Sequence, residues 1–133
     1  MKAKSIGYLG VAQTLINKQE EISSTVSVHC SYYAVLMYMK YILAHTDRQP
    51  LSYEEQDEKS KGEGSHEYMI EQIRQRINHR KAGRDFAQAV RDLKQARKYA
   101  DYTTKQFTVE ESLELKQQAE GSITKLKTYF GNL

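Results

Sequence analysis

The sequence predicts an all-α protein, an up-and-down bundle of about five helices, and two observations lead to this prediction. Apolar residues recur at spacings of three and four over five long segments, and none of these segments alternates as a strand does. Seven glycines and one proline in 133 residues leave room for long, uninterrupted helices. The length corresponds to one domain, residues 1–133, that can bury a single core.

The central helix is predicted over residues 25–44, TVSVHCSYYAVLMYMKYILA, which is apolar on nearly every side. A helix with this pattern is usually buried. Its length would reach across a bilayer, but His29, Lys40 and four tyrosines make that position costly, so we expect no membrane association. Three hydroxyl residues are candidates for its N-cap, namely Ser23, Ser24 and Thr25.

Amphipathic segments on both sides of the central helix predict the other four helices. They cover residues 3–18, 65 to about 78, 84–102 and 109–130. Ser65 is the expected N-cap of the helix that begins there. Thr108 and Glu111 form a capping box, which predicts the start of the last helix.

Residues 46–65, TDRQPLSYEEQDEKSKGEGS, are predicted to be a long polar loop, because charges of both signs, a proline and two glycines interrupt any periodicity. One helical turn near residues 53–58 fits the same pattern. The run of carboxylates in this loop has neither histidines nor a rigid scaffold beside it, so we predict no metal site there.

The composition favours a cytoplasmic protein. The single cysteine, Cys30, cannot form an internal disulfide, and its apolar surroundings favour a core position over a catalytic thiolate. The N-terminal apolar run is interrupted by Gly7, Gln13 and Thr14, which argues against a secretion signal. A formal net charge of +3 permits contact with RNA phosphates without requiring it. The sequence contains no Gly-rich phosphate loop or paired-cysteine motif, so no metal ion or cofactor is expected.

A basic cluster surrounds the end of the helix predicted from residue 65. Cations at a helix C-terminus compensate the helix dipole, and the same cations would suit a phosphate-binding patch, so both interpretations stay open. The cluster consists of Arg74, Arg76, His79, Arg80, Lys81 and Arg84.

Three motifs in this order resemble the HEPN domain superfamily, and in particular its small single-domain bacterial and archaeal members. They are HCSYYAVLMYMKYIL at 29–43, GSHEYMI at 64–70 and ARKYADYTTKQFTVEESLELKQQAEGSITKL at 96–126. The resemblance implies a helical bundle that pairs as a homodimer. It also implies a toxin–antitoxin context in which the partner is a minimal nucleotidyltransferase. Active members of the superfamily are metal-independent ribonucleases with an arginine and a histidine four to six residues apart.

Carried onto this chain, the resemblance assigns Arg97 and Tyr102 to the Arg-x4-Tyr part of the family motif. Thr103 stands where the toxins place histidine, and threonine cannot exchange a proton near neutral pH. Asp101 shares a helix face with Arg97. It is expected either to orient Arg97 on a phosphate or to form a simple ion pair with it.

Other histidines also need assignment. Arg74 and His79 match Arg-x4-His literally but lie on a different helix, and they form a second candidate site. His66 corresponds to a family position at a helix start, where it would cap the helix or contact a partner. His29 is expected in the core or at an interface rather than in a site.

Three functions of different classes follow from these residues. The first is a HEPN-like protein that binds a nucleotide, RNA or a protein partner without efficient catalysis. The second is an endoribonuclease toxin restrained by a nucleotidyltransferase that modifies Tyr102. The third is a structural protein that dimerises through a helical face. The presence of Arg97, Asp101 and Tyr102 without the histidine favours the first.

Overall fold

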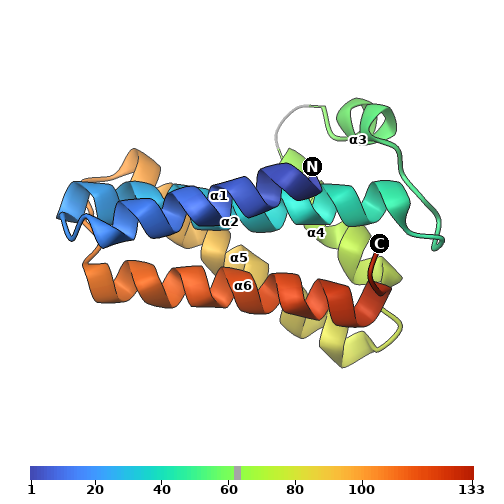
Figure 1. Ribbon diagram of the computed structural model, residues 1–133. Helices are drawn as coiled ribbons and strands as arrows, with labels where there is room; N and C mark the ends of the chain where they lie inside the picture. Colours follow the sequence, from blue (N-terminus) through green and yellow to red (C-terminus); the bar gives the residue numbers. More distant parts are fainter. Residues whose placement is uncertain (62–63) are drawn as a thin grey trace.

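The computed structural model of the protein describes residues 1–61 and 64–133. This part of the chain contains six α-helices and no strand, which confirms the all-α class but not the count of five (Figure 1). The helices are α1 (Lys2–Asn17), α2 (Glu21–His45), α3 (Tyr53–Lys59), α4 (Ser65–Arg76), α5 (Arg80–Tyr102) and α6 (Val109–Phe130).

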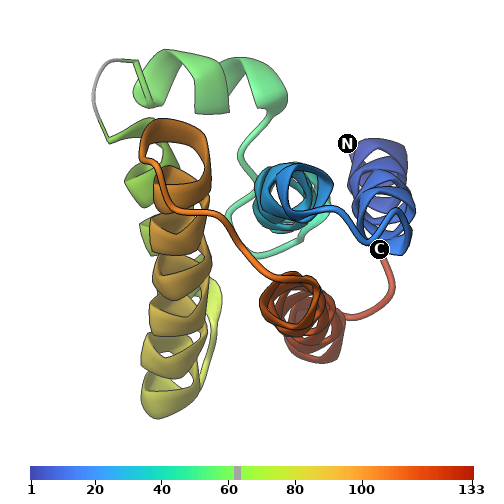
Figure 2. The same cartoon turned by 90° about the vertical axis from the view of Figure 1, so that its left-hand side faces the viewer.

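Helix α2 is the centre of the bundle. It packs against each of the other five helices, and an end-on view shows it surrounded by α1, α6, α5 and α3 (Figure 2). The prediction of a buried central helix is therefore confirmed. Its predicted capping residues are wrong, because the helix begins at Glu21 and Ser23, Ser24 and Thr25 lie buried within its first turns.

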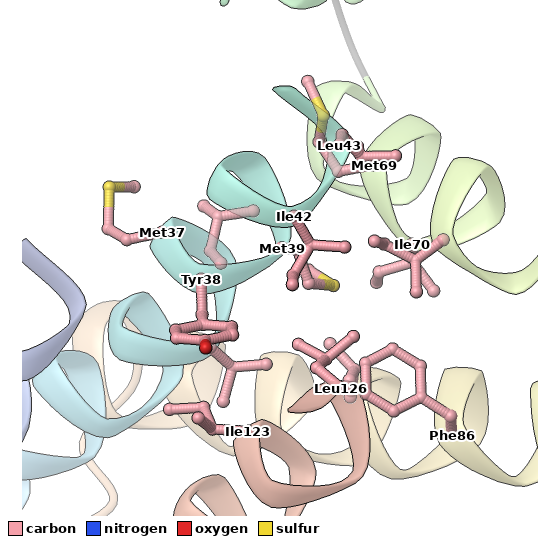
Figure 3. Close-up of a cluster of buried hydrophobic side chains, with 14 of the residues drawn as sticks. Met37, Tyr38, Met39, Ile42, Leu43, Met69, Ile70, Phe86, Ile123 and Leu126 are labelled. Carbon is pink, nitrogen blue, oxygen red and sulfur yellow. The ribbon is translucent and has the colours of Figure 1, made fainter. Parts of the chain in front are cut away.

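The core lies where α2 faces α4, α5 and α6 (Figure 3). Met39 and Ile42 of α2 have no exposed surface, and neither do Ile70 of α4, Phe86 of α5 and Leu126 of α6. These side chains interdigitate from four helices, so no two of the helices can form the core alone. Cys30 is also buried, as predicted.

The stretch predicted as a polar loop is more ordered than expected. It contains α3, which opens with a capping box between Ser52 and Glu55. Leu51 and Gln56 are buried, and the Gln56 amide donates to the carbonyls of Lys40 and Leu51. Because most residues of this stretch are charged or polar, its sequence does not indicate that Leu51 and Gln56 anchor it to α2. Residues 62 and 63 of the same stretch lie outside the described residues.

Two capping predictions had different outcomes. The capping box at the start of α6 is confirmed, because the Thr108 hydroxyl accepts from the Glu111 amide and the Glu111 carboxylate accepts from the Thr108 amide. Ser65 is not an N-cap. The N-cap of α4 is Gly64, whose φ of 86° is a left-handed conformation that glycine adopts without strain, and Ser65 is the first helical residue.

Candidate functional site

Arg97 ends the buried face of α5. The residues before it on this face are small or apolar and pack α5 onto α2. Arg97 continues their helical spacing, so its side chain also points towards α2. The small and apolar residues are Gly83, Phe86, Ala87, Val90 and Leu93. The Arg97 side chain retains only 7% of its exposed surface. A nearly buried guanidinium requires compensation, because the group stays charged at every physiological pH.

Aromatic rings supply part of that compensation. The guanidinium carbon of Arg97 lies 5.3 Å from the centre of the Tyr32 ring and 5.5 Å from that of Tyr33. Tyr102, the last residue of α5, adds a third ring at 5.7 Å. Rings within about 6 Å attract a cation through their quadrupoles. The tandem tyrosines of α2 thus face the arginine of α5, although sequence analysis had not placed them in the site.

The polar contacts of Arg97 are weak by comparison. Its Nη1 donates to the Tyr102 hydroxyl at 3.4 Å and lies 3.6 Å from Oδ2 of Asp101. The predicted pairing of Arg97 with Asp101 on one helix face is present. The buried Nε has no hydrogen-bond partner among the described residues. An unpaired buried donor costs about 1–3 kcal/mol, so the fold alone does not satisfy this side chain.

Arg76 is a second buried arginine, and all three of its side-chain nitrogens donate hydrogen bonds. Its Nε donates to the carbonyls of Arg48 and Gln49, Nη2 donates to Gln49, and Nη1 donates to the carbonyl and side chain of Gln72. All three nitrogens are used, and they tie the segment after α2 to the end of α4. Arg76 is a structural residue, whereas Arg97 keeps one buried donor without a partner.

A histidine reaches the site from α2. His29 donates from Nδ1 to Oδ2 of Asp101 at 2.7 Å, although the two residues are 72 positions apart. Its ring stacks on Tyr33 with centroids 4.4 Å apart, and its side chain is 38% exposed. The sequence predicts His29 in the core or at an interface, and its exposure together with the Asp101 contact excludes a core position.

A second histidine, His66 in the first turn of α4, contacts the same rings. The Tyr32 hydroxyl and Nδ1 of His66 share a hydrogen bond of 2.9 Å, and burial raises the pKa of the Tyr32 phenol. Burial, with the positive charges of Arg97, Lys94, Lys40 and Lys98, lowers the pKa of His66 to about 4. His66 is therefore neutral at pH 7, and cations from α2 and α5 converge around it.

The two residues of the second candidate site, Arg74 and His79, each contact a neighbour in the chain. The Arg74 guanidinium forms a bidentate ion pair with Glu71 on its own helix. His79 is the N-cap of α5 and accepts from the amide of Ala82. Each side chain therefore has a local structural partner, and the site they would form together stays a prediction.

Two further observations limit the chemistry of the described residues. They contain no group of three or more His, Cys, Asp or Glu side chains placed to hold a metal ion. Within residues 1–61 and 64–133, no helix combines the length and the apolar character needed to cross a bilayer.

Comparison with known proteins adds no assignment. No family model, no curated protein and no solved structure matches this chain. The case for function therefore rests on the arrangement of Arg97, its three tyrosines and the two histidines.

Proposed function

We propose that this protein is HEPN-like and binds the phosphate of RNA or of a nucleotide at Arg97, without efficient catalysis. The observation that supports this most directly is the unpartnered Nε of Arg97, set against the saturated guanidinium of Arg76. A buried arginine kept only for structure has its donors paired. An arginine that binds an anion keeps some N–H donors free for that anion, and the planar guanidinium matches the spacing of phosphate oxygens.

Tyr102 is the exposed neighbour of Arg97. The residue is 75% exposed, its ring centre lies 5.7 Å from the guanidinium carbon, and its hydroxyl accepts from Nη1 over a long 3.4 Å contact. In this proposal the exposed Tyr102 side chain turns aside when a phosphate approaches. The displaced ring then offers a face on which a base can stack, while Asp101 holds the arginine in place.

The surrounding charge supports an anionic ligand. Lys94 and Lys98 of α5 and Lys40 of α2 add, like Arg97, to the positive charge around His66. Glu67 contacts Lys94 at 3.9 Å and also pairs with Arg91, so it offsets only part of this charge. A phosphate arriving at Arg97 enters a region of positive potential.

Binding can be measured by fluorescence anisotropy with a labelled single-stranded oligoribonucleotide at fixed salt. Arg97→Met should weaken binding by roughly 10-fold or more, the loss expected for a hydrogen bond to a charged group. Lys125→Met is the matched control, because Lys125 is exposed on α6, lies outside the basic cluster at the end of α4, and its loss changes the net charge equally. Equal affinities for the Arg97 and Lys125 variants would exclude the proposal.

A second candidate function is an endoribonuclease, and the contact between His29 and Asp101 favours it. In-line attack by a 2′-hydroxyl needs a proton acceptor, and histidine can serve near neutral pH. In this candidate Arg97 stabilises the phosphate and Asp101 orients the His29 ring. A minimal nucleotidyltransferase partner would then have the exposed Tyr102 hydroxyl as its target for modification.

A homodimer also belongs to this proposal. Ile22 and Val26, one turn apart on α2, are 60% and 44% exposed, and they precede His29 and Tyr33 at helical spacing. Exposed apolar residues in a row are typical of a contact surface. Pairing through Ile22 and Val26 would set the Arg97 site at the edge of the dimer interface, in a cytoplasmic protein as the composition favours.

A further inference from the structure

We propose that a hollow on α1 beside Tyr33 holds a nucleobase next to the phosphate at Arg97, which makes the ligand an unpaired RNA strand. The inference rests on the proposed function, because it needs a phosphate at Arg97. It adds a second subsite and excludes duplex RNA as the ligand.

The hollow is a shallow depression on one face of α1, widely open to solvent, lined by Lys4, Gly7, Tyr8 and Val11, with a volume of about 270 Å³. Tyr8 supplies an aromatic ring, and Val11 is 50% exposed. Lys4, an exposed residue, adds a cation at the rim. A flat apolar wall with one aromatic ring and one cation suits the face and polar edge of a base.

Tyr33 connects the hollow to Arg97. The Tyr8 and Tyr33 ring centres lie 5.9 Å apart, and the Tyr33 ring lies 5.5 Å from the Arg97 guanidinium. The His29 ring stacks on the same Tyr33 ring. An RNA strand with one phosphate at Arg97 could thus pass the Tyr33 ring and place its next base against the Tyr8 ring of the hollow on α1.

Gly7 keeps the hollow open without a structural need for glycine. A Cβ at this position would meet no atom within 4 Å, so packing does not require its absence. Glycine inside a helix costs about 1 kcal/mol relative to alanine. A side chain at position 7 would project into the hollow, since Gly7 is one of its lining residues.

The expected occupant is a base from a single strand. In duplex RNA the base faces are stacked on one another and the edges are paired, so no face can turn onto Tyr8. An unpaired strand exposes its faces, and stacking on aromatic side chains is the usual way in which proteins bind them.

Gly7→Leu tests the subsite because leucine fills the hollow. Gly10→Leu is the matched control: Gly10 lies on the same helix, also has nothing within 4 Å of a Cβ, and does not line the hollow. Both changes raise helix propensity equally, so their effects on folding should match. The probes are a labelled ten-nucleotide RNA of mixed sequence, a strand of the same length made of abasic residues, and a duplex.

We expect Gly7→Leu to weaken binding of the single strand about fivefold or more, and Gly10→Leu to leave it within twofold. The abasic strand should bind both variants equally, and the duplex should bind more weakly than the single strand. Equal affinities of the two leucine variants for the single strand would overturn the inference. So would a change in oligomeric mass confined to Gly7→Leu, which would make the hollow a contact between two copies of the chain.

The two variants separate an error in the base subsite on α1 from an error in the phosphate site at Arg97. If Arg97→Met loses affinity and Gly7→Leu does not, the phosphate site stands and the base subsite is wrong. If Arg97→Met binds as the unchanged chain does, the proposed function itself is wrong.

Discussion

Nδ1 of His29 lies 2.7 Å from Oδ2 of Asp101, which joins the central helix to the end of α5. Asp101 also lies 3.6 Å from Nη1 of Arg97. One carboxylate thus orients both an imidazole and a guanidinium. The contact brings a side chain of α2 to the two polar residues at the end of α5.

The ribonuclease candidate makes a prediction about His29. His29→Ala should reduce RNA cleavage by roughly 100-fold or more, because it removes the proton acceptor, while RNA affinity stays nearly unchanged. Cleavage of a 5′-labelled RNA in the presence of a chelator measures the rate. His45→Ala is the control, since His45 is an exposed histidine on the same helix. Undiminished cleavage by the His29 variant would rule out this role.

The two buried arginines should differ in their effect on stability. Arg76→Met removes the partners of the Arg48, Gln49 and Gln72 carbonyls and should cost about 2–4 kcal/mol of unfolding free energy. Arg97→Met should change it by less than about 1 kcal/mol, because a buried charge with few partners is replaced by an apolar chain. Urea unfolding followed by circular dichroism gives both values. A larger loss at Arg97 than at Arg76 would mean that Arg97 is the structural residue.

The lowered pKa of His66 predicts a pH-dependent stability. The folded-state pKa is about 4, below the ordinary value of 6.5, so the unfolded chain binds the proton more readily between these two values. The contribution of His66 to the free energy of unfolding should therefore be constant above about pH 6.5 and should fall as the pH drops from there towards 4. The loss from this half-buried ring should be on the order of 1–2 kcal/mol after allowance for solvent screening.

Urea unfolding at pH 7 and pH 4.5 tests this effect. His66→Gln keeps a group that can accept from the Tyr32 hydroxyl but cannot titrate. The variant should lose less stability between the two pH values than the unchanged chain, because carboxylates such as Glu71 titrate equally in both proteins. Parallel losses in the two proteins would show that His66 does not govern the transition.

The homodimer should be detectable by light scattering. We expect a mass near twice the chain mass of 15.4 kDa at tens of micromolar. Val26→Lys should shift the mass towards the monomer, because it places a charge in the apolar contact. Leu113→Lys is the control: Leu113 is 37% exposed and lies on α6. A monomer mass for the unchanged chain, or equal effects of both variants, would contradict the proposed surface.

Local pattern was sufficient for much of the fold. The helical periods of α2, α5 and α6 and the capping box at Thr108 depend on residues a few positions apart, so the sequence displays them directly. Helix α3 was predicted only as a turn within a loop. Its residues are mostly charged, and the two side chains that anchor the segment, Leu51 and Gln56, show their role only against α2.

Helical spacing alone is enough to predict an all-α chain with Arg97 and Asp101 on one helix face, because that spacing fixes neighbours on the same helix. The contacts between side chains of different helices depend on how the helices pack. His29 reaches Asp101, and Tyr32 and Tyr33 face Arg97, because α2 packs against α5 at one particular register. That register comes from core packing across four helices, which no local spacing encodes.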